Sequence, residues 1–280
     1  MKKWAVSAII YLLVVVAGYS VYASLTGQEK TDNAHKQTEN HETEGHAADE
    51  HEGAHEEDHG GHGDHAAMES EVTAKAGVTN EEIIIELKDQ QGNAVSDLEV
   101  NHEKLLHLIV VDDHLEQYVH LHPEQVKPGT FKIKHSLPEG SYKAFIDIKP
   151  KNLAYAVKPV PFTIGVEGKE HAHPQLTPDA VLEKEVDGYK VTLNSSEWKA
   201  GKDVTLTFNL HGKQVEPYLG AMGHVVILDE SGEKYLHVHP ANENETIFET
   251  SFEQPGIYKI WAEFKQNGKV RVFPFVVEVK

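Results

Sequence analysis

The sequence predicts an all-β fold in which two tandem β-sandwich domains follow an N-terminal transmembrane helix and a disordered, histidine-rich stalk. Three observations lead to this prediction: an uncharged apolar run near the N-terminus, a long polar segment after it, and short apolar strands between turn signals in the rest of the chain. The expected parts are an anchor or signal peptide at 1–27, a stalk at 28–77, a first sandwich at 78–167, a linker at 168–180 and a second sandwich at 181–280.

Composition narrows the function classes before any motif is considered. The chain has 26 Lys and Arg against 45 Asp and Glu, a net charge of −19 that repels phosphate backbones and excludes ordinary nucleic-acid binding. The absence of cysteine excludes disulfides, thiolate zinc sites and a cysteine nucleophile. Twenty histidines supply the commonest metal-ligand side chain, so divalent metal ions are the expected partners.

The N-terminal run gives the expected location. Lys2 and Lys3 precede Trp4–Ala23, an uncharged run long enough, at about 1.5 Å per residue, to cross a bilayer core of roughly 30 Å. The positive charges before it place the N-terminus in the cytoplasm and the rest of the chain outside. The alternative is a signal peptide cleaved after Ala23, but the run exceeds the roughly 7–15 apolar residues typical of such peptides, which favours a single-pass anchor.

The segment 28–77 has too few large apolar residues to form a core and is expected to be disordered. Its histidines alternate with carboxylates, a pattern that indicates a weak, high-capacity ligand for Zn²⁺, Cu²⁺ or Ni²⁺. Two H-E-x-x-H matches, at His51 and His55, lie in this polar segment rather than on a packed helix and do not indicate a protease. The repeating histidines are His35, His41, His46, His51, His55, His59, His62 and His65.

Beyond the stalk the sequence predicts short strands, and its second half repeats the pattern of the first. The strands expected in the first half are 83–87, 105–111, 118–121, 131–133, 142–148 and 160–166. His107, His120, His122 and Pro123 recur at a constant offset of 117 as His224, His237, His239 and Pro240. Asp112 and Asp229, Phe131 and Phe248 follow the same offset, and after one deletion Tyr142 matches Tyr258 and Phe145 matches Trp261 at 116. The chain therefore carries a tandem duplication.

Hairpin geometry predicts that the repeated histidines converge. A two-residue turn at Ser231-Gly232 would give opposed residues whose numbers sum to 463, which places His224 opposite His239 with His237 on the same face. An even loop centred on His114-Leu115 gives a sum of 229 and brings His107, His120 and His122 together in the same way.

Three imidazoles on one face suit Zn²⁺ or Cu²⁺, so we expect one metal site in each sandwich. Met222 is a further candidate, as a soft axial ligand in the second copy, and His171 and His173 in the linker could bridge the domains. The other singled-out residues are given structural roles. Phe131, Phe248, Tyr142, Tyr258 and Trp261 are expected in the cores, Asp112 and Asp229 as turn caps, and His102, His114, His135 and His211 in solvent.

The motifs Leu219–Leu228 and Tyr235–Pro240, with Trp198–Gly201 ahead of a strand, resemble the FixH/YtkA-like extracytoplasmic β-sandwich domains. These domains are similar in architecture to CopC-type copper-binding proteins. The resemblance covers about 196–279, and 82–166 through the internal repeat. It implies a bacterial envelope protein with an immunoglobulin-like or CopC-like fold, associated with copper or another transition metal.

The favoured function is an extracytoplasmic, membrane-anchored protein that binds copper or zinc for capture, storage, detoxification or delivery to a metal transporter. The first alternative is a non-catalytic adhesion or assembly module in whose sandwiches the histidines are structural. A metal-dependent hydrolytic enzyme is a weaker alternative, because no general base recurs beside both clusters and no G-x-S-x-G, P-loop or G-x-G-x-x-G is present. We therefore expect no enzymatic activity.

Overall fold

The computed structural model describes residues 69–79, 81–165, 175–238, 240, 242 and 244–280, and its elements are strands. The N-terminal apolar run, the stalk as far as residue 68, and His171 and His173 lie outside the described residues. Within the described part of the chain, no helix has the length and apolar character needed to cross a bilayer.

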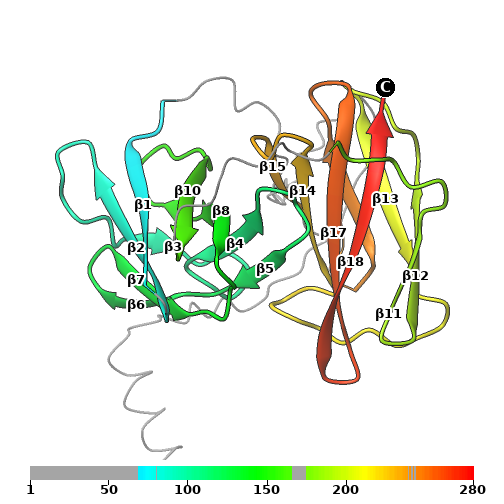
Figure 1. The fold of residues 1–280 in the computed structure, drawn as a ribbon, viewed down its shortest axis with the longest axis horizontal. Coiled ribbons are helices and arrows are strands. Elements are labelled where there is room, and N and C mark those ends of the chain that lie inside the picture. Colours follow the sequence, from blue (N-terminus) through cyan, green and yellow to red (C-terminus); the bar gives the residue numbers. More distant parts are fainter. Residues whose placement is uncertain (1–68, 80, 166–174, 239, 241, 243) are drawn as a thin grey trace, which may run out of the picture. The chain divides into compact units, whose positions relative to one another are not determined.

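The first repeat forms two four-stranded antiparallel sheets (Figure 1). One sheet has the order β1-β2-β7-β6, formed by Val72–Val78, Glu82–Asp89, Thr130–Lys134 and Glu124–Lys127. The other has the order β10-β8-β4-β5, formed by Pro159–Ile164, Gly140–Asp147, His107–Asp112 and Tyr118–Leu121. The short strands β3 (Leu98–Glu99) and β9 (Lys149–Pro150) pair separately.

The second repeat has the same two-sheet plan. Its first sheet has the order β11-β12-β13-β16, formed by Glu183–Val186, Tyr189–Ser195, Asp203–Asn209 and Ile247–Ser251. Its second sheet has the order β15-β14-β17-β18, formed by Tyr235–Val238, His224–Asp229, Gly256–Gln266 and Lys269–Val279.

In each repeat the core lies between the two sheets. In the first, Ile83 and Ile85 of β2 pack in one buried cluster with Leu108 and Val110 of β4. In the second, Leu206 of β13 shares a cluster with Val225, Ile227 and Ile260. Alternate residues of β2 and β4 in the first repeat, and of β13 and β14 in the second, enter these cores, as expected for a pleated strand with one face inward. The predicted all-β, sandwich-type fold is confirmed.

The first sandwich begins earlier than the sequence indicated. The expected stalk ended at residue 77, but Val72–Val78 forms β1 and pairs along its whole length with β2. Val72 is buried, and Ala74, Ala76 and Val78 pack against the same core. Two of the four inward residues are alanines, so the strand lacks the large apolar side chains that distinguish a strand from a polar linker in sequence.

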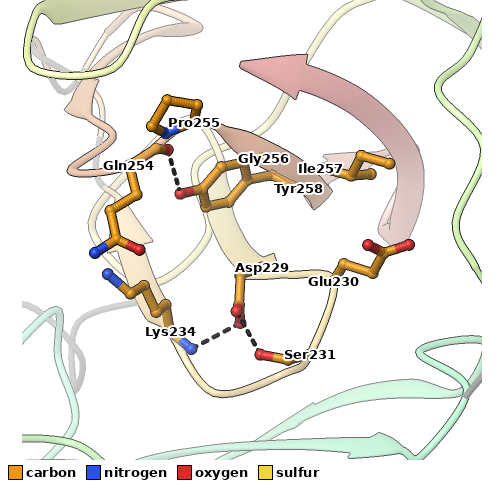
Figure 2. Close-up of a pocket in the computed structure, with 9 residues that line it drawn as sticks. All are labelled: Asp229, Glu230, Ser231, Lys234, Gln254, Pro255, Gly256, Ile257 and Tyr258. Atoms are coloured by element: carbon orange, nitrogen blue, oxygen red, sulfur yellow. Dashed lines mark hydrogen bonds between the residues drawn. The ribbon is translucent and has the colours of Figure 1, made fainter. Parts of the chain in front are cut away.

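Both sandwiches contain a tyrosine whose hydroxyl donates to a backbone carbonyl four residues earlier. Tyr142 donates to Pro138 O at 2.9 Å, and Tyr258 donates to Gln254 O at 2.8 Å. This bond fixes the corner at which the chain enters β8 or β17, as in the tyrosine corner of immunoglobulin-type sandwiches. In the second repeat the corner lines a pocket of about 230 Å³ together with Asp229 and its turn (Figure 2).

We predict that Tyr142→Phe and Tyr258→Phe each lower the free energy of unfolding by about 1 kcal/mol, the usual contribution of one intramolecular hydrogen bond. The two losses should add, because the corners belong to different sandwiches. Urea unfolding of the full chain measures both. Tyr189→Phe is the control, since Tyr189 lies under Arg271 and no described hydrogen bond involves its hydroxyl. Corner variants as stable as this control would contradict the assignment.

Candidate metal centre

The hairpins that carry the histidines have the predicted registers. Ile109 opposes His120 between β4 and β5, and Val226 opposes His237 between β14 and β15, which gives the expected sums of 229 and 463. The expected two-residue turn at Ser231-Gly232 is wrong. Leu228 and Tyr235 are the last paired residues, and the NH of Gly232 donates to Asp229 O. The register of this hairpin is nevertheless the predicted one, because the longer loop also has an even number of residues.

The turn aspartates have the local role expected of them. Asp112 Oδ1 accepts from the backbone NH groups of Glu116 and Gln117, at 2.7 and 2.8 Å. Asp229 Oδ1 accepts from the NH groups of Glu233 and Lys234, also at 2.7 and 2.8 Å. These bonds close each loop and hold the two strands of the hairpin in register.

The first histidine triad converges as predicted. The ring centroids of His107, His120 and His122 lie 4.6–5.2 Å apart. In the second copy the rings of His224 and His237 are 6.0 Å apart, while His239 lies outside the described residues. Met222 is half-buried two residues before β14, and the described ring contacts and hydrogen bonds of these histidines do not include it.

The first triad and the described histidines of the second, His224 and His237, form one cluster, so the two sites expected in separate sandwiches would adjoin each other. The ring of His237 lies 5.3 Å from that of His107 and 5.6 Å from that of His120, and His120 lies 6.0 Å from His224. The sequence repeat predicts two similar faces, and the contact between these faces was not among the sequence-based expectations.

The contact is made by the outer faces of β4 and β8 against those of β14 and β17. These faces form a third buried cluster, separate from the two sandwich cores. Tyr118 stacks on Trp261 and Tyr235 stacks on Phe145, both with centroids 5.0 Å apart. Because Tyr118 corresponds to Tyr235 and Phe145 to Trp261, the two stacks are related by a pseudo-twofold axis. Trp261, expected in the second core, belongs to this interface. The other buried members are Ile109, Val111, Leu115, Val226 and Leu228.

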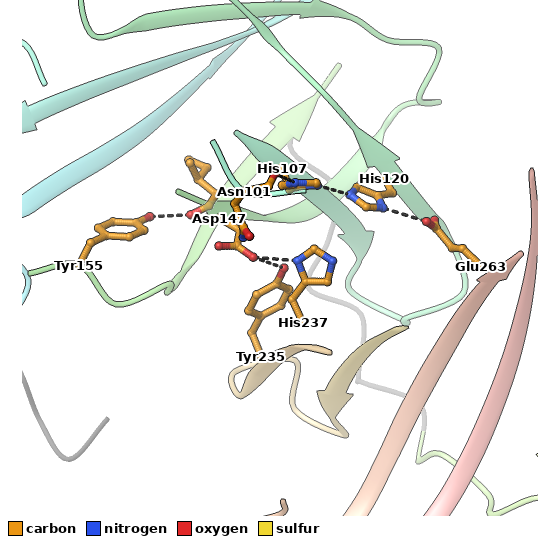
Figure 3. A network of polar contacts seen from close by, with 9 residues as sticks. Asn101, His107, His120, Asp147, Tyr155, Tyr235, His237 and Glu263 are labelled. Atoms are coloured by element: carbon orange, nitrogen blue, oxygen red, sulfur yellow. Dashed lines mark hydrogen bonds and ion pairs between the residues drawn. The ribbon is translucent and has the colours of Figure 1, made fainter. Parts of the chain in front are cut away.

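Two carboxylates continue the same reciprocal arrangement. His120 Nδ1 donates to Glu263 Oε2 of the second sandwich at 2.8 Å, and His237 Nδ1 donates to Asp147 Oδ2 of the first, also at 2.8 Å (Figure 3). Asp147 opposes His107 on the neighbouring strand, and Glu263 opposes His224. Sequence reasoning missed both carboxylates, although they are related by the offset of 116 that already matched Phe145 with Trp261.

The remaining pair of histidines is held by backbone carbonyls. His107 Nε2 donates to Asn101 O and His224 Nε2 donates to Tyr218 O, both at 2.9 Å. Each carbonyl starts a tight turn with two consecutive left-handed residues, His102 and Glu103 in the first copy and Leu219 and Gly220 in the second. Positive φ at both central residues is the type I′ arrangement.

These outer bonds determine which ring nitrogens face inward. A carbonyl or carboxylate oxygen only accepts, so His107 carries its proton on Nε2, and His120 and His237 carry theirs on Nδ1. His107 Nδ1 then faces His120 Nε2 at 3.0 Å. Two lone pairs at that distance repel each other unless a cation lies between them. One cation between these two nitrogens, a proton or a metal ion, therefore completes the network.

Burial favours neutral imidazoles, the form that binds metals. Desolvation lowers the pKa of His107 and of His224 to about 4, that of His122 to about 3, and that of His237 well below its usual value. Interactions between neighbouring imidazolium charges act in the same direction on all four.

The geometry fits a metal ion. Ligand nitrogens of His107, His120 and His237 all lie within 4.8 Å of one another. A tetrahedral ion with bonds of about 2.0–2.1 Å holds its ligand nitrogens about 3.3 Å apart, so modest ring movements would complete the site. The outer nitrogen of each of these rings donates to a carboxylate or carbonyl, as the outer nitrogen of a metal-bound histidine usually does.

The four histidines expected in solvent differ in environment. His211 is exposed and bonds to Thr192, while His114 and His135 are half-buried. His102 is also half-buried, and its ring lies 6.0 Å from that of His224 and 6.5 Å from that of His107. His102 thus adjoins the cluster. It was missed because the second copy has Leu219 at this position, so the repeat gave no signal there.

Fold and site together define a protein of two β-sandwiches joined through a buried histidine–carboxylate cluster. The chain belongs to the family described as Domain of unknown function (DUF8832), whose model matches residues 62–168 and 184–280. No curated protein matches the chain.

Three solved structures show weak similarity, and this chain spans less than two thirds of the length of each. The Escherichia coli adhesin FdeC is 14% identical over 75% of this chain and 64% of its own, with a TM-score of 0.24. The chicken CNTN1 FN1–FN3 domains are 10% identical over 75% and 66%, with a TM-score of 0.22. The BSP domain of a biofilm-associated protein is 13% identical over 75% and 30%, also with a TM-score of 0.22.

We predict that the metal-free protein loses stability on acidification. The lowered pKa values mean that the unfolded chain takes up protons below about pH 6.5, whereas the folded chain takes them up only nearer pH 4. The stability contributed by these neutral imidazoles is complete above about pH 6.5 and is lost as the pH falls toward 4. Urea unfolding with a chelator, at a series of pH values, measures it.

His122→Asn should make this pH dependence shallower. Each histidine that takes up a proton on unfolding contributes about 1.4 kcal/mol per pH unit to the slope of the unfolding free energy, and the variant has one such histidine fewer. His211→Asn, at the exposed histidine, is the control and should leave the slope unchanged. Stability that is constant between about pH 7 and pH 5 would contradict the neutral, buried state of these rings.

Proposed function

We propose that this protein is a membrane-anchored, extracytoplasmic metal-binding protein that holds one copper or zinc ion between its two sandwiches, for capture, storage, detoxification or delivery to a transporter. The observation that supports it best is the inward convergence of imidazole nitrogens from His107, His120 and His237, whose outer nitrogens are each hydrogen-bonded. Such bonds orient the rings before the ion arrives and so reduce the ordering cost of binding.

The chemistry of the donor set supports a borderline divalent ion. Imidazole suits Zn²⁺ and Cu²⁺, and Glu263 and Asp147 supply negative charge behind the ligands without occupying the ligand positions. A bound ion would act as a Lewis acid, but this setting favours holding the ion over turnover. His107 and His224 are 0% exposed and His237 is 4% exposed, so the described cluster gives a substrate little access.

The location is proposed from the sequence. The apolar run Trp4–Ala23 would anchor the chain and place both sandwiches outside the cytoplasm, and the histidine-rich segment after it would concentrate cations near them. The resemblance to FixH/YtkA-like domains supports the same placement.

We predict one tight divalent-ion site per chain. His120→Ala and His237→Ala, although in different sandwiches, should each abolish it, because both remove a ligand of the same ion. Isothermal calorimetry on the full chain measures the stoichiometry, and histidines of the N-terminal segment should contribute only weaker sites. His211→Ala is the matched control at an exposed histidine.

Either of two results would contradict this assignment. If the unaltered chain has two tight sites and each variant loses only one of them, each sandwich holds its own independent site. Absence of tight binding by the unaltered chain would overturn the metal-binding function and leave the histidines a structural role in docking the sandwiches.

The second functional prediction concerns metal preference. Imidazole sites without thiolate follow the Irving–Williams order, so Cu²⁺ should displace Zn²⁺ in direct competition. The availability of each metal outside the cell also decides which ion occupies the site. Two measurements identify the physiological ion: metal analysis of protein purified from its native envelope, and growth of a deletion strain in excess copper and in excess zinc. Zinc-loaded protein with unchanged copper tolerance would contradict a copper role and leave the site itself intact.

A further inference from the structure

His122 differs from the other rings of the first triad in how it is held. Both ring nitrogens of His107 and of His120 lie within 3.0 Å of a described polar partner. The Nε2 atom of His122 is buried, yet it has no hydrogen-bond partner among the described residues. No described bond therefore fixes the orientation of this ring, although it lies 4.6 Å from His120 and 5.0 Å from His107, centroid to centroid.

Exposure also varies across the cluster. The side chains of His120 and His237 are each 2% exposed, and His107 and His224 are fully buried. His122 and His102 are half-buried. His120 is also half-buried as a whole residue, but its side chain is only 2% exposed. His122 and His102 are therefore the candidates for the outer edge of the cluster, although the Nε2 atom of His122 is itself buried.

The spacing of the rings permits transfer from this outer pair inward. The rings of two histidines bound to one tetrahedral ion have centroids about 5 Å apart. The distances from His122 to His107 and His120 already match this value. The ring of His102 lies further away, 6.5 Å from that of His107 and 6.0 Å from that of His224. An ion bound by His122 can thus move to His107 or His120 by exchanging one imidazole for another.

The side chain at position 102 is not explained by the turn that carries it. His102 has a φ of 45°, in a type I′ turn where Asn or Gly is the usual choice. The equivalent turn in the second copy carries Leu219 with a φ of 51°. The first copy therefore has an imidazole where the second copy has an aliphatic side chain, and this difference makes the pseudo-symmetric cluster asymmetric.

We infer that His122 and His102 form an entry position, which receives the ion from solvent and passes it to the buried nitrogens of His107, His120 and His237. This inference rests on the proposed metal-binding function. The entry residues govern how fast the ion enters and leaves, and the buried residues govern how tightly it is held.

Stopped-flow mixing of the full chain with Cu²⁺, followed by tryptophan fluorescence, tests the entry position, because Trp261 packs in the adjoining interface. His122→Ala and His102→Leu should each slow both association and chelator-driven release by about tenfold, equivalent to ~1.4 kcal/mol in the barrier. Because both rates fall together, the dissociation constant should change by less than about threefold. Leucine at 102 reproduces the residue of the second copy. His211→Ala is the control, and thermal unfolding verifies that each variant is folded.

The outcomes separate the entry position from the metal site. Unchanged rates in both variants would overturn the entry position while the metal site stands. A dissociation constant raised more than about tenfold with unchanged association would also overturn it, and would make the residue an ordinary ligand. Slowing by His122→Ala alone would overturn the role of His102. If the unaltered chain shows no tight Cu²⁺ binding, both the proposed function and the entry position fail.

Discussion

A histidine–carboxylate pair is tolerated inside a protein only when both members are present and correctly placed, because desolvation of either one alone is costly. The pairs His120–Glu263 and His237–Asp147 each take one member from either sandwich, and the four side chains are at most 17% exposed. Undocking the sandwiches would therefore break both pairs at once. The stacked aromatics and the shared apolar cluster form the rest of the buried interface between the same two sandwiches. The same contacts therefore hold the two sandwiches together and set the geometry of the imidazoles.

The fold was largely predictable, because strand alternation and duplication are local and repeated signals. The same holds for the convergence of the first triad and of His224 with His237, which depends only on the parity of a hairpin loop. The register was as predicted even where the predicted turn at Ser231-Gly232 was wrong. The β1 strand was missed because alanines form much of its inner face. A strand can thus be predicted where large apolar residues alternate with polar ones, but not where the inward-facing residues are small.

The merging of the two triads was not predicted, because it depends on contact between residues far apart in sequence. A signal was nevertheless present. The runs Leu108–Val111 and Val225–Leu228 are apolar at every position, whereas a sandwich strand with one face in water alternates. Both runs are buried on both faces, one face in a sandwich core and the other in the shared interface. Continuous apolar character in a strand beside candidate ligands therefore indicates that the ligand face is covered by a further partner.

The duplication also explains how the cluster can be nearly symmetric in its interior and asymmetric at its edge. In a homodimer both subunits carry the same residue at every position, so any edge histidine recurs on the opposite side. In a tandem chain the two copies can diverge, as His102 and Leu219 have done. The interior retains its paired carbonyl and carboxylate contacts because each is needed to satisfy a buried ring. The edge, where solvent satisfies polar groups, carries no such requirement, and there a change in one copy alone can give the cluster a single side of access.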